Sequence, residues 1–273
     1  TPGEKAGIRP GDKIIRINGE EFTGEQMDQA VKIMRGEPGT DVTITILRYS
    51  NEKAPEEFDL TITREMINII SAEGQMLEDN IGYIHIASFD ENTDKYYTEA
   101  KEQLLDEGAE GIIIDLRNNP GGLLDTVLSI SDRLLPEGPL LFTKNKKGDE
   151  IEESSDAKMD EFPIVVLVNE GSASASEIMS GAIQDYERGP VIGTTTFGKG
   201  IVQTIIPLGD GTGFKLTVSE YFTPKHRQIH EIGVVPDIEV ENAEGDFNFG
   251  PEYLETDKQL QRGIEELQKE MTN

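Results

Sequence analysis

The chain has 273 residues, 36% of them hydrophobic, which is enough for one large domain or two smaller ones with a buried core. Its 53 acidic and 25 basic residues give a formal net charge of −28, which disfavours binding to nucleic acid or to an anionic membrane. The sequence holds no cysteine, so disulfides, cysteine nucleophiles and thiolate metal sites are excluded. Its apolar runs, such as PIVVLV, are far shorter than a membrane-spanning helix.

The N-terminal segment, residues 1–65, is predicted to form short strands around a single helix. DKIIRING reads as a strand that enters an Asn-Gly turn, and DVTITILR reads as another strand. Between them, a helix in GEQMDQAVKIMR is predicted to end at a C-cap on Gly36, and segment 51–57 is predicted to be a hairpin or loop. The residues at helical spacing in this helix are Met27, Ala30, Val31 and Met34.

This order of elements, with the turns AGIRPGD and RGEPGT, resembles a PDZ domain of the kind found in bacterial proteases. PDZ domains bind an extended peptide tail by adding it as a strand to their sheet. The loop and strand that hold the terminal carboxylate normally precede AGIRPGD. We therefore expect a PDZ domain that is incomplete at its N-terminus, in a chain that is a fragment or a processed form.

From residue 66 to residue 245, β-type runs alternate with amphipathic helices, which predicts an α/β core of parallel strands joined by crossover helices. Residues 246–273 are predicted to form a helical segment that packs on the core or on another subunit, because Leu260, Ile264, Leu267 and Met271 lie at helical spacing. The expected core elements are, in order, a strand in IGYIHIASF, a helix from Thr93 to Leu105, a strand in GIIIDLR, a helix in GLLDTVLSISDRLL, a strand in PIVVLVN and a helix in SASEIMSGAIQDY.

The stretch GTTTFGKG, residues 193–200, fits the spacing of a phosphate-binding loop. Such a loop needs a Ser or Thr after the lysine and a helix that leaves it. Gly200 stands where the hydroxyl should be, and the following IVQTIIPL is β-branched and lacks a helical period. The sequence therefore disfavours a nucleotide site and leaves Lys199 for other chemistry.

Three serines follow the predicted strand PIVVLVN in the stretch NEGSASASEI. A helix that starts near Ser174 places its free amides at the C-terminal end of a parallel strand, where the sites of open α/β sheets gather. A serine there has an environment that stabilises an oxyanion within reach. The alternative is structural, because Ser174 and Glu177 match the S-x-x-E capping box, and Ser172 or Ser176 could be solvated hydroxyls.

The turn DLRNNPGG, residues 115–122, ends another predicted strand and opens a helix. Its two glycines leave backbone amides bare, so this turn can supply one oxyanion donor while the amide that follows Ser174 supplies the other. A glycine-rich turn without a catalytic role is the alternative.

No histidine lies near these stretches in the sequence, yet a serine nucleophile needs a base. Desolvation lowers the proton affinity of a lysine, so Lys199 is the candidate base. Gln203, four residues further along a predicted strand, would face the same side and could orient the amine through a hydrogen bond.

Together these motifs closely resemble the carboxyl-terminal processing proteases, also called tail-specific proteases. The resemblance covers Thr1 to about Glu241 and rests on DLRNNPGG, VVLVNEGSASASEI, GTTTFGKGIVQ, LTVSEYFTP and GVVPDIEV in this order. It implies a serine endopeptidase with a crotonase-like (ClpP-like) α/β core and a regulatory PDZ domain that recognises the C-terminal tails of protein or peptide substrates. The implied site residues are Ser174 as nucleophile, Lys199 as base, Gln203 as its partner, and the amides of Ala175 and Gly121, or else Gly122, as oxyanion donors.

The resemblance implies no cofactor and no metal. His226 and His230 are four residues apart, but Pro224 and a following glycine favour a loop or strand over a metal-binding helix. The resemblance also implies an extracytoplasmic location in the periplasm, at the cell surface or secreted. It leaves open a homo-oligomer and membrane anchoring by a segment that precedes Thr1.

Two other functions stay open. A catalytically silent peptide-binding module of the same fold would capture peptides without cleaving them, which the intact Ser174, Lys199 and Gln203 disfavour. An acyl-CoA enzyme of the crotonase type would share the core fold, but the Ser/Lys pair and the PDZ-like segment argue against it. Covalent labelling by a serine-directed reagent separates the peptidase from both.

Overall fold

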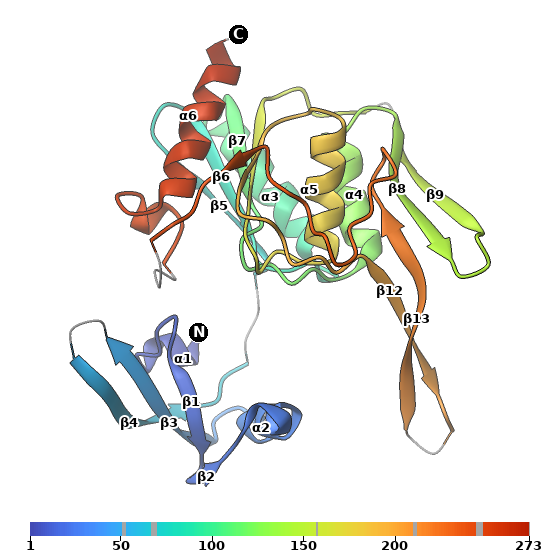
Figure 1. Ribbon diagram of the computed structural model, residues 1–273. Helices are drawn as coiled ribbons and strands as arrows, with labels where there is room; N and C mark the ends of the chain where they lie inside the picture. Colours follow the sequence, from blue (N-terminus) through green and yellow to red (C-terminus); the bar gives the residue numbers. More distant parts are fainter. Residues whose placement is uncertain (51–52, 67–69, 157, 210–211, 244–247, 273) are drawn as a thin grey trace. The chain divides into compact units, whose positions relative to one another are not determined.

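The computed structural model describes residues 1–50, 53–66, 70–156, 158–209, 212–243 and 248–272. The chain divides into two compact units, which Figure 1 shows with colours that follow the sequence. The first unit comprises Thr1–Ile69 with Gly245–Asn248, and the second comprises Ile70–Glu244 with Phe249–Asn273. The C-terminal helical segment expected from the sequence thus belongs largely to the α/β unit. In the part of the chain that is described, no helix combines the length and the apolar character needed to cross a bilayer.

The first unit is a four-stranded antiparallel sheet with strand order β2-β1-β3-β4. Alternate residues of its strands point into a small core, where Ile17 and Ile44 are buried with Ala30 of the helix. Its elements are α1 (Pro2–Lys5), β1 (Lys13–Ile17), β2 (Glu20–Glu21), the 3-10 helix η1 (Gly24–Gln26), α2 (Met27–Met34), β3 (Asp41–Ser50) and β4 (Lys53–Thr63).

Two details of the N-terminal prediction are wrong. Helix α2 ends at Met34, and Arg35 is already extended, so Gly36 is not its C-cap. Met27, expected on the buried face, is 65% exposed because the first turn of the predicted helix is the separate 3-10 helix η1. Residues 53–57 belong to strand β4, while residues 51 and 52 of the predicted hairpin lie outside the described part.

The second unit is built on a six-stranded sheet with strand order β14-β11-β10-β7-β6-β5. All its pairings are parallel except that of β5 with β6, which confirms the α/β class. Its strands are β5 (Ala72–Met76), β6 (Ile81–Ile86), β7 (Gly111–Asp115), β10 (Ile164–Val168), β11 (Val191–Gly193) and β14 (Ile238–Glu239).

Helices cover both faces of this sheet (Figure 1). Strand residues alternate between the two faces, so Ile112 and Ile114 pack with α3, α4 and α5, whereas Ile113 packs with α6. The helices are α3 (Thr93–Asp106), α4 (Leu124–Leu134), α5 (Ala175–Asp185) and α6 (Lys258–Thr272), and the 3-10 helix η2 (Pro251–Tyr253) precedes α6. The sequence predicted all four α-helices, to within a few residues at their ends.

A second, antiparallel sheet of the same unit has strand order β12-β13-β8-β9. Its strands are β8 (Gly138–Asn145), β9 (Glu150–Ser155), β12 (Ile201–Pro207) and β13 (Gly213–Phe222). Strand β8 pairs with β13 only from Phe222 back to Ser219. The rest of β13 pairs with β12 alone, so the β12–β13 hairpin extends beyond the sheet, as Figure 1 shows.

A buried ion network ties the start of α6 to the end of β7. Arg117 is 1% exposed and donates hydrogen bonds to Asp115 at 2.6 Å and to Asp257 at 2.7 Å. Burial alone would lower the pKa of Arg117, but the two carboxylates outweigh this effect and raise it. Tyr83 donates to Asp115 at 2.7 Å, and burial raises the pKa of this phenol. The network therefore buries Arg117 and its two carboxylate partners as ion pairs inside the core.

Candidate active site

The three serines of the NEGSASASEI stretch have different surroundings. The Ser172 hydroxyl donates to the carbonyl of Leu116 at 2.8 Å, and the Ser176 hydroxyl donates to the carbonyl of Asn119 at 3.0 Å. Both side chains are buried, so the alternative that they are solvated is wrong. Ser174 is partly exposed, and it is the one of the three that a substrate can reach.

Ser174 stands at the N-cap of α5 with a φ of 55° and a ψ of −111°. A non-glycine residue seldom takes this backbone conformation, and its strain costs about 1–3 kcal/mol. A strained turn that leads from a strand into a helix can expose the side chain at its tip, as a nucleophile requires. The turn between β10 and α5 thus holds Ser174 in a conformation that capping alone does not require.

The carboxylate of Glu177 connects the Ser174 turn with the Lys199 loop. Its Oε2 accepts hydrogen bonds from the amides of Ser174 and Lys199, each at 2.8 Å. Its Oε1 accepts from the hydroxyl of Thr196 at 2.6 Å and from the amide of Gly198 at 2.7 Å. Glu177 is fully buried, and the hydrogen bonds from these four donors offset the free-energy cost of removing its carboxylate from water. The capping-box motif predicts only the bond from Ser174, because a local motif carries no information about the loop 20 or so residues away.

The DLRNNPGG turn packs directly against the serine. The amide of Ala173 donates to the carbonyl of Asn119 at 2.9 Å. Gly121 has a φ of 99°, and a Cβ on it would lie 2.8 Å from Ser174 Cβ and 2.9 Å from the Ala175 amide nitrogen. Only glycine permits this approach. The predicted oxyanion residues Ala175 and Gly121 are therefore neighbours.

The amides that are free to bind an oxyanion are not the pair, Ala175 and Gly121, that the resemblance implied first. The Gly121 amide donates to the side-chain oxygen of Asn119 at 2.8 Å. The amides of Gly122 and Ala175 donate to no group within the described ranges, and Gly122 is exposed. Of the two glycines considered, Gly122 thus has the available donor in this conformation.

Lys199 lies in an irregular loop between β11 and β12. Gly200 packs so closely on segment 229–231 that a Cβ would lie 2.4 Å from the His230 amide nitrogen. Strand β12 follows at Ile201, which confirms that no helix leaves GTTTFGKG. A phosphate-binding loop is therefore excluded by the backbone that follows the lysine.

Gln203 lies on β12, where the pairing with β13 shifts register between Val202 and Gln203. Its side chain is exposed and donates to the hydroxyl of Thr217 at 3.4 Å. The expectation that Gln203 faces Lys199 depends on a regular alternation, which a bulge interrupts. In the described conformation the side chain of Gln203 contacts Thr217.

His226 and His230 both lie in the irregular segment after β13, which is a loop, one of the two conformations expected in place of a helix. His226 stacks on Phe142 and lies 3.3 Å from a Glu150 oxygen. Over the described ranges, no group of three or more His, Asp or Glu side chains could hold a metal ion.

We expect Glu177→Gln to weaken the site without unfolding the protein. The amide keeps the size of the side chain but offers one oxygen to four donors, which costs about 2–3 kcal/mol of stability. Displacement of the Lys199 loop should lower kcat by roughly tenfold to a hundredfold, with a smaller effect on KM. The measurement is steady-state peptide cleavage together with thermal unfolding.

Glu170→Gln is the matched control, since Glu170 also accepts a hydroxyl hydrogen bond, from Thr194 at 3.1 Å, but is exposed. This variant should keep both activity and stability. Equal kinetics for Glu177→Gln and Glu170→Gln would show that Glu177 does not hold the two loops in register.

The chain is similar to known proteins along most of its length. Residues 80–240 match the model of peptidase family S41, and residues 1–48 match a PDZ domain model. The carboxyl-terminal-processing protease of Synechocystis sp. is 41% identical over 247 residues, covering 88% of this chain and 57% of that protein. The carboxy-terminal processing protease CtpA of Bacillus subtilis is 38% identical over 265 residues, covering 96% of this chain and 55% of that protein. The chain thus spans somewhat more than half the length of these relatives.

Among solved structures, the photosystem II D1 C-terminal processing protease is similar, with a TM-score of 0.71 and 31% sequence identity. The match covers 93% of this chain and 68% of that one. The S41 model includes both the Ser174 turn and the Lys199 loop, and more than half of the chain lies within it. The chain therefore belongs to peptidase family S41 and carries a PDZ domain at its N-terminal end.

Proposed function

We propose that the chain is a serine endopeptidase that cleaves protein substrates recognised through their C-terminal tails. Ser174 is the nucleophile, Lys199 is the general base, and Gln203 supports the lysine once it turns from Thr217. The PDZ domain presents the substrate tail. The relatives named as carboxyl-terminal processing proteases support this substrate class.

One observation carries the proposal. The amides of Ser174 and Lys199 donate to the same oxygen atom of Glu177, each at 2.8 Å. The backbones of the two residues therefore meet at a buried point, although 25 positions separate them in the chain. A serine and a lysine brought together at the start of a helix, beside free amides, form the arrangement that acyl transfer needs.

The reaction follows from these positions. Ser174 Oγ attacks the scissile carbonyl carbon while neutral Lys199 takes its proton, and the carbonyl oxygen becomes an oxyanion. The amides of Ala175 and of Gly122, or of Gly121 if Asn119 releases it, donate to that oxygen. The C–N bond breaks as Lys199 returns the proton to the leaving amine. Water, deprotonated by Lys199, then attacks the acyl carbon. The bond to Ser174 Oγ breaks, this oxygen takes the proton back from Lys199, and the acyl group leaves as a carboxylic acid that ionises in water.

Labelling by a fluorophosphonate tests the proposal, because this reagent reacts with an activated serine whatever the peptide specificity. The native chain should be labelled at Ser174. Lys199→Ala should label roughly a hundredfold or more slowly, since a general base contributes at least that much. Peptide mapping identifies the labelled residue.

Two controls sharpen this test. Lys225→Ala removes an exposed lysine and should leave the labelling rate unchanged. Lys199→Arg keeps a positive charge but cannot act as a base, so it should label as slowly as Lys199→Ala. Labelling of Lys199→Ala at the native rate, or labelling of a different serine, would contradict the Ser/Lys assignment.

An extracytoplasmic location belongs to the same proposal, by analogy with the family. Homo-oligomerisation and membrane anchoring are further expectations. Fractionation of the producing cell and light scattering of the purified chain test them.

A further inference from the structure

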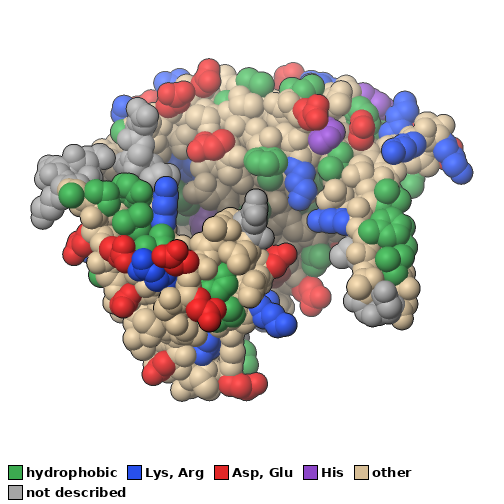
Figure 2. Space-filling model, turned by 60° about the horizontal axis from the view of Figure 1, so that its bottom comes forward, with side chains coloured by type: hydrophobic (Ala, Val, Ile, Leu, Met, Phe, Trp, Pro, Cys, Tyr) green, Lys and Arg blue, Asp and Glu red, His purple; other side chains and the backbone are tan. Residues whose placement is uncertain are grey.

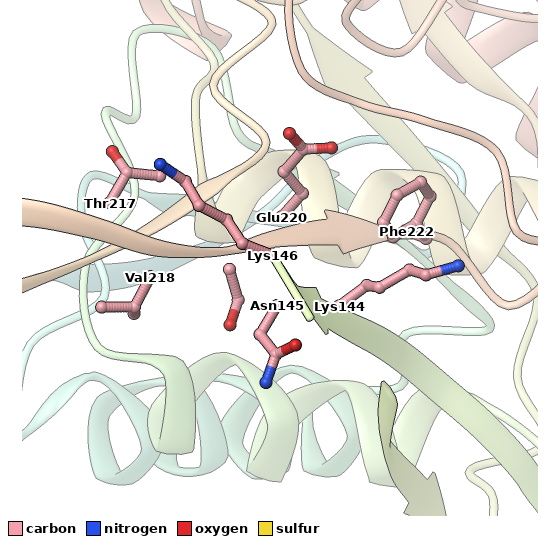
Figure 3. Close-up of a pocket in the computed structure, with 8 residues that line it drawn as sticks. Lys144, Asn145, Lys146, Thr217, Val218, Glu220 and Phe222 are labelled. Atoms are coloured by element: carbon pink, nitrogen blue, oxygen red, sulfur yellow. The ribbon is translucent and has the colours of Figure 1, made fainter. Parts of the chain in front are cut away.

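A pocket of about 150 Å³ lies where strand β8 ends beside β13. Asn145, the last residue of β8, lies opposite Ser219, and Lys144 lies opposite Glu220. Figure 3 shows the side chain of Lys146 extending toward Thr217, whereas that of Lys144 extends beside Phe222. The pocket thus offers two ammonium groups, an amide and two hydroxyls from Thr217 and Ser219.

The charge of this pocket is opposite to that of the chain. The whole protein carries a formal charge of −28, yet Lys146 and Lys147 follow one another at the β8–β9 turn, two residues after Lys144. Figure 2 shows Lys and Arg side chains gathered at this end of the molecule. Neither Lys144 nor Lys146 makes an ion pair with a residue in the described ranges. Glu220 offsets one of the two charges, so the pocket keeps a net attraction for an anion.

The pocket adjoins the proposed active site through strand β13. Thr217 lies opposite Gln203 on β12 and accepts its hydrogen bond at 3.4 Å. Glu220 lies opposite Ile201, two residues after Lys199. Neighbouring strands are only about 4.8 Å apart. A substrate chain that passes Lys199 and crosses β12 and β13 therefore comes within reach of Lys146.

We propose that this pocket is a subsite for a carboxylate of the substrate, an Asp or Glu side chain near the scissile bond. The ammonium group of Lys146 attracts the substrate carboxylate. The hydroxyl of Thr217 accepts the hydrogen bond of Gln203 through its oxygen, so it can still donate its own proton to that carboxylate. This inference rests on the proposed peptidase function. It adds a preference for acidic residues at one position of the substrate.

The test uses short fluorogenic peptides that carry a single Glu at successive positions, each paired with a peptide that has Gln there. The native chain should cleave the Glu peptide faster at one position, by roughly fivefold in kcat/KM at low salt. High salt should reduce this ratio. Lys146→Gln should bring it close to one, and Lys147→Gln, which removes the same charge outside the pocket, should keep it.

A binding measurement separates this inference from the proposed function. The same Glu and Gln peptides are titrated into Ser174→Ala, with and without Lys146→Gln, and anisotropy reports binding. A Glu preference that Lys146→Gln removes supports the subsite even if the native chain cleaves no peptide. Equal cleavage and equal binding of the paired peptides at every position would overturn the subsite and leave the peptidase intact. A preference that survives in the Lys144→Gln, Lys146→Gln double variant would also overturn it.

Discussion

Ser174→Ala is expected to abolish cleavage of an unfolded protein substrate, with a loss of at least about a thousandfold in rate. The oxygen that attacks the scissile carbonyl is gone, and the buried hydroxyls of Ser172 and Ser176 cannot replace it because both donate to backbone carbonyls. Alanine also has a Cβ, so the strained turn and the Glu177 contacts should persist. The measurement is substrate loss on a gel at equal concentrations of folded protein, with circular dichroism as the check on folding.

Ser129→Ala is the control for this experiment, because Ser129 is an exposed residue of α4 whose hydroxyl donates to Asp94 at 3.2 Å, far from the site in the sequence. It should cleave at the native rate. Retained cleavage in Ser174→Ala would remove Ser174 from the mechanism. A native chain that binds the substrate but cleaves nothing would instead favour the silent peptide-binding module.

Asp257→Ala is expected to lower the free energy of unfolding by about 3–5 kcal/mol. Its carboxylate is fully buried and accepts from Arg117 at 2.7 Å, from the Gly250 amide at 2.7 Å and from the Leu260 amide at 3.1 Å. The last bond caps α6, so the variant loses a helix cap together with an ion pair. Denaturant unfolding of the two proteins measures the difference.

The same carboxylate predicts a pH dependence. Burial would raise the pKa of Asp257, but the hydrogen bond and charge of Arg117 outweigh it and lower the pKa below its ordinary value of 3.8. A depressed pKa in the folded state contributes stability above pH 3.8, and this contribution is lost as the pH falls through the folded-state value. The difference in unfolding free energy between the native protein and Asp257→Ala should therefore narrow in acid.

Glu255→Ala is the control, because it removes an exposed carboxylate two residues earlier, and it should change the free energy of unfolding little. A loss as large as that of Asp257→Ala would refute the role of the buried pair.

The sequence predicted the elements that carry a strong period and a buried face. β7 and β10 are continuous apolar runs, and α3 to α6 show a helical period, so both were predictable from local pattern. In the second unit, the strands β5, β8, β9, β13 and β14 were not predicted. β9 reads EIEESS and β5 reads AEGQM, compositions with little β-propensity, and each is a strand because a neighbour supplies hydrogen bonds and packing.

Part of the candidate site was likewise predictable from the sequence, and part was not. Motif positions placed Ser174, Ala175 and Lys199 on the turns where the structure has them. The connecting role of Glu177 could not be read from the chain, because three of its four donors come from residues 196–199. The side-chain direction of Gln203 depends on a bulge that no local pattern reveals. The preference for Gly122 over Gly121 arises from one side chain, Asn119, which accepts the Gly121 amide.

The Arg117–Asp257 contact has a consequence for the order of folding. The two residues are 140 positions apart, so loop closure over most of the second unit precedes the contact, and such distant pairings slow folding. During synthesis, Arg117 emerges from the ribosome long before its second carboxylate does. The face of the main sheet that α6 covers also stays open until then. A nascent chain of this design therefore completes its core late, and cleavage activity should appear only after residue 257 has emerged.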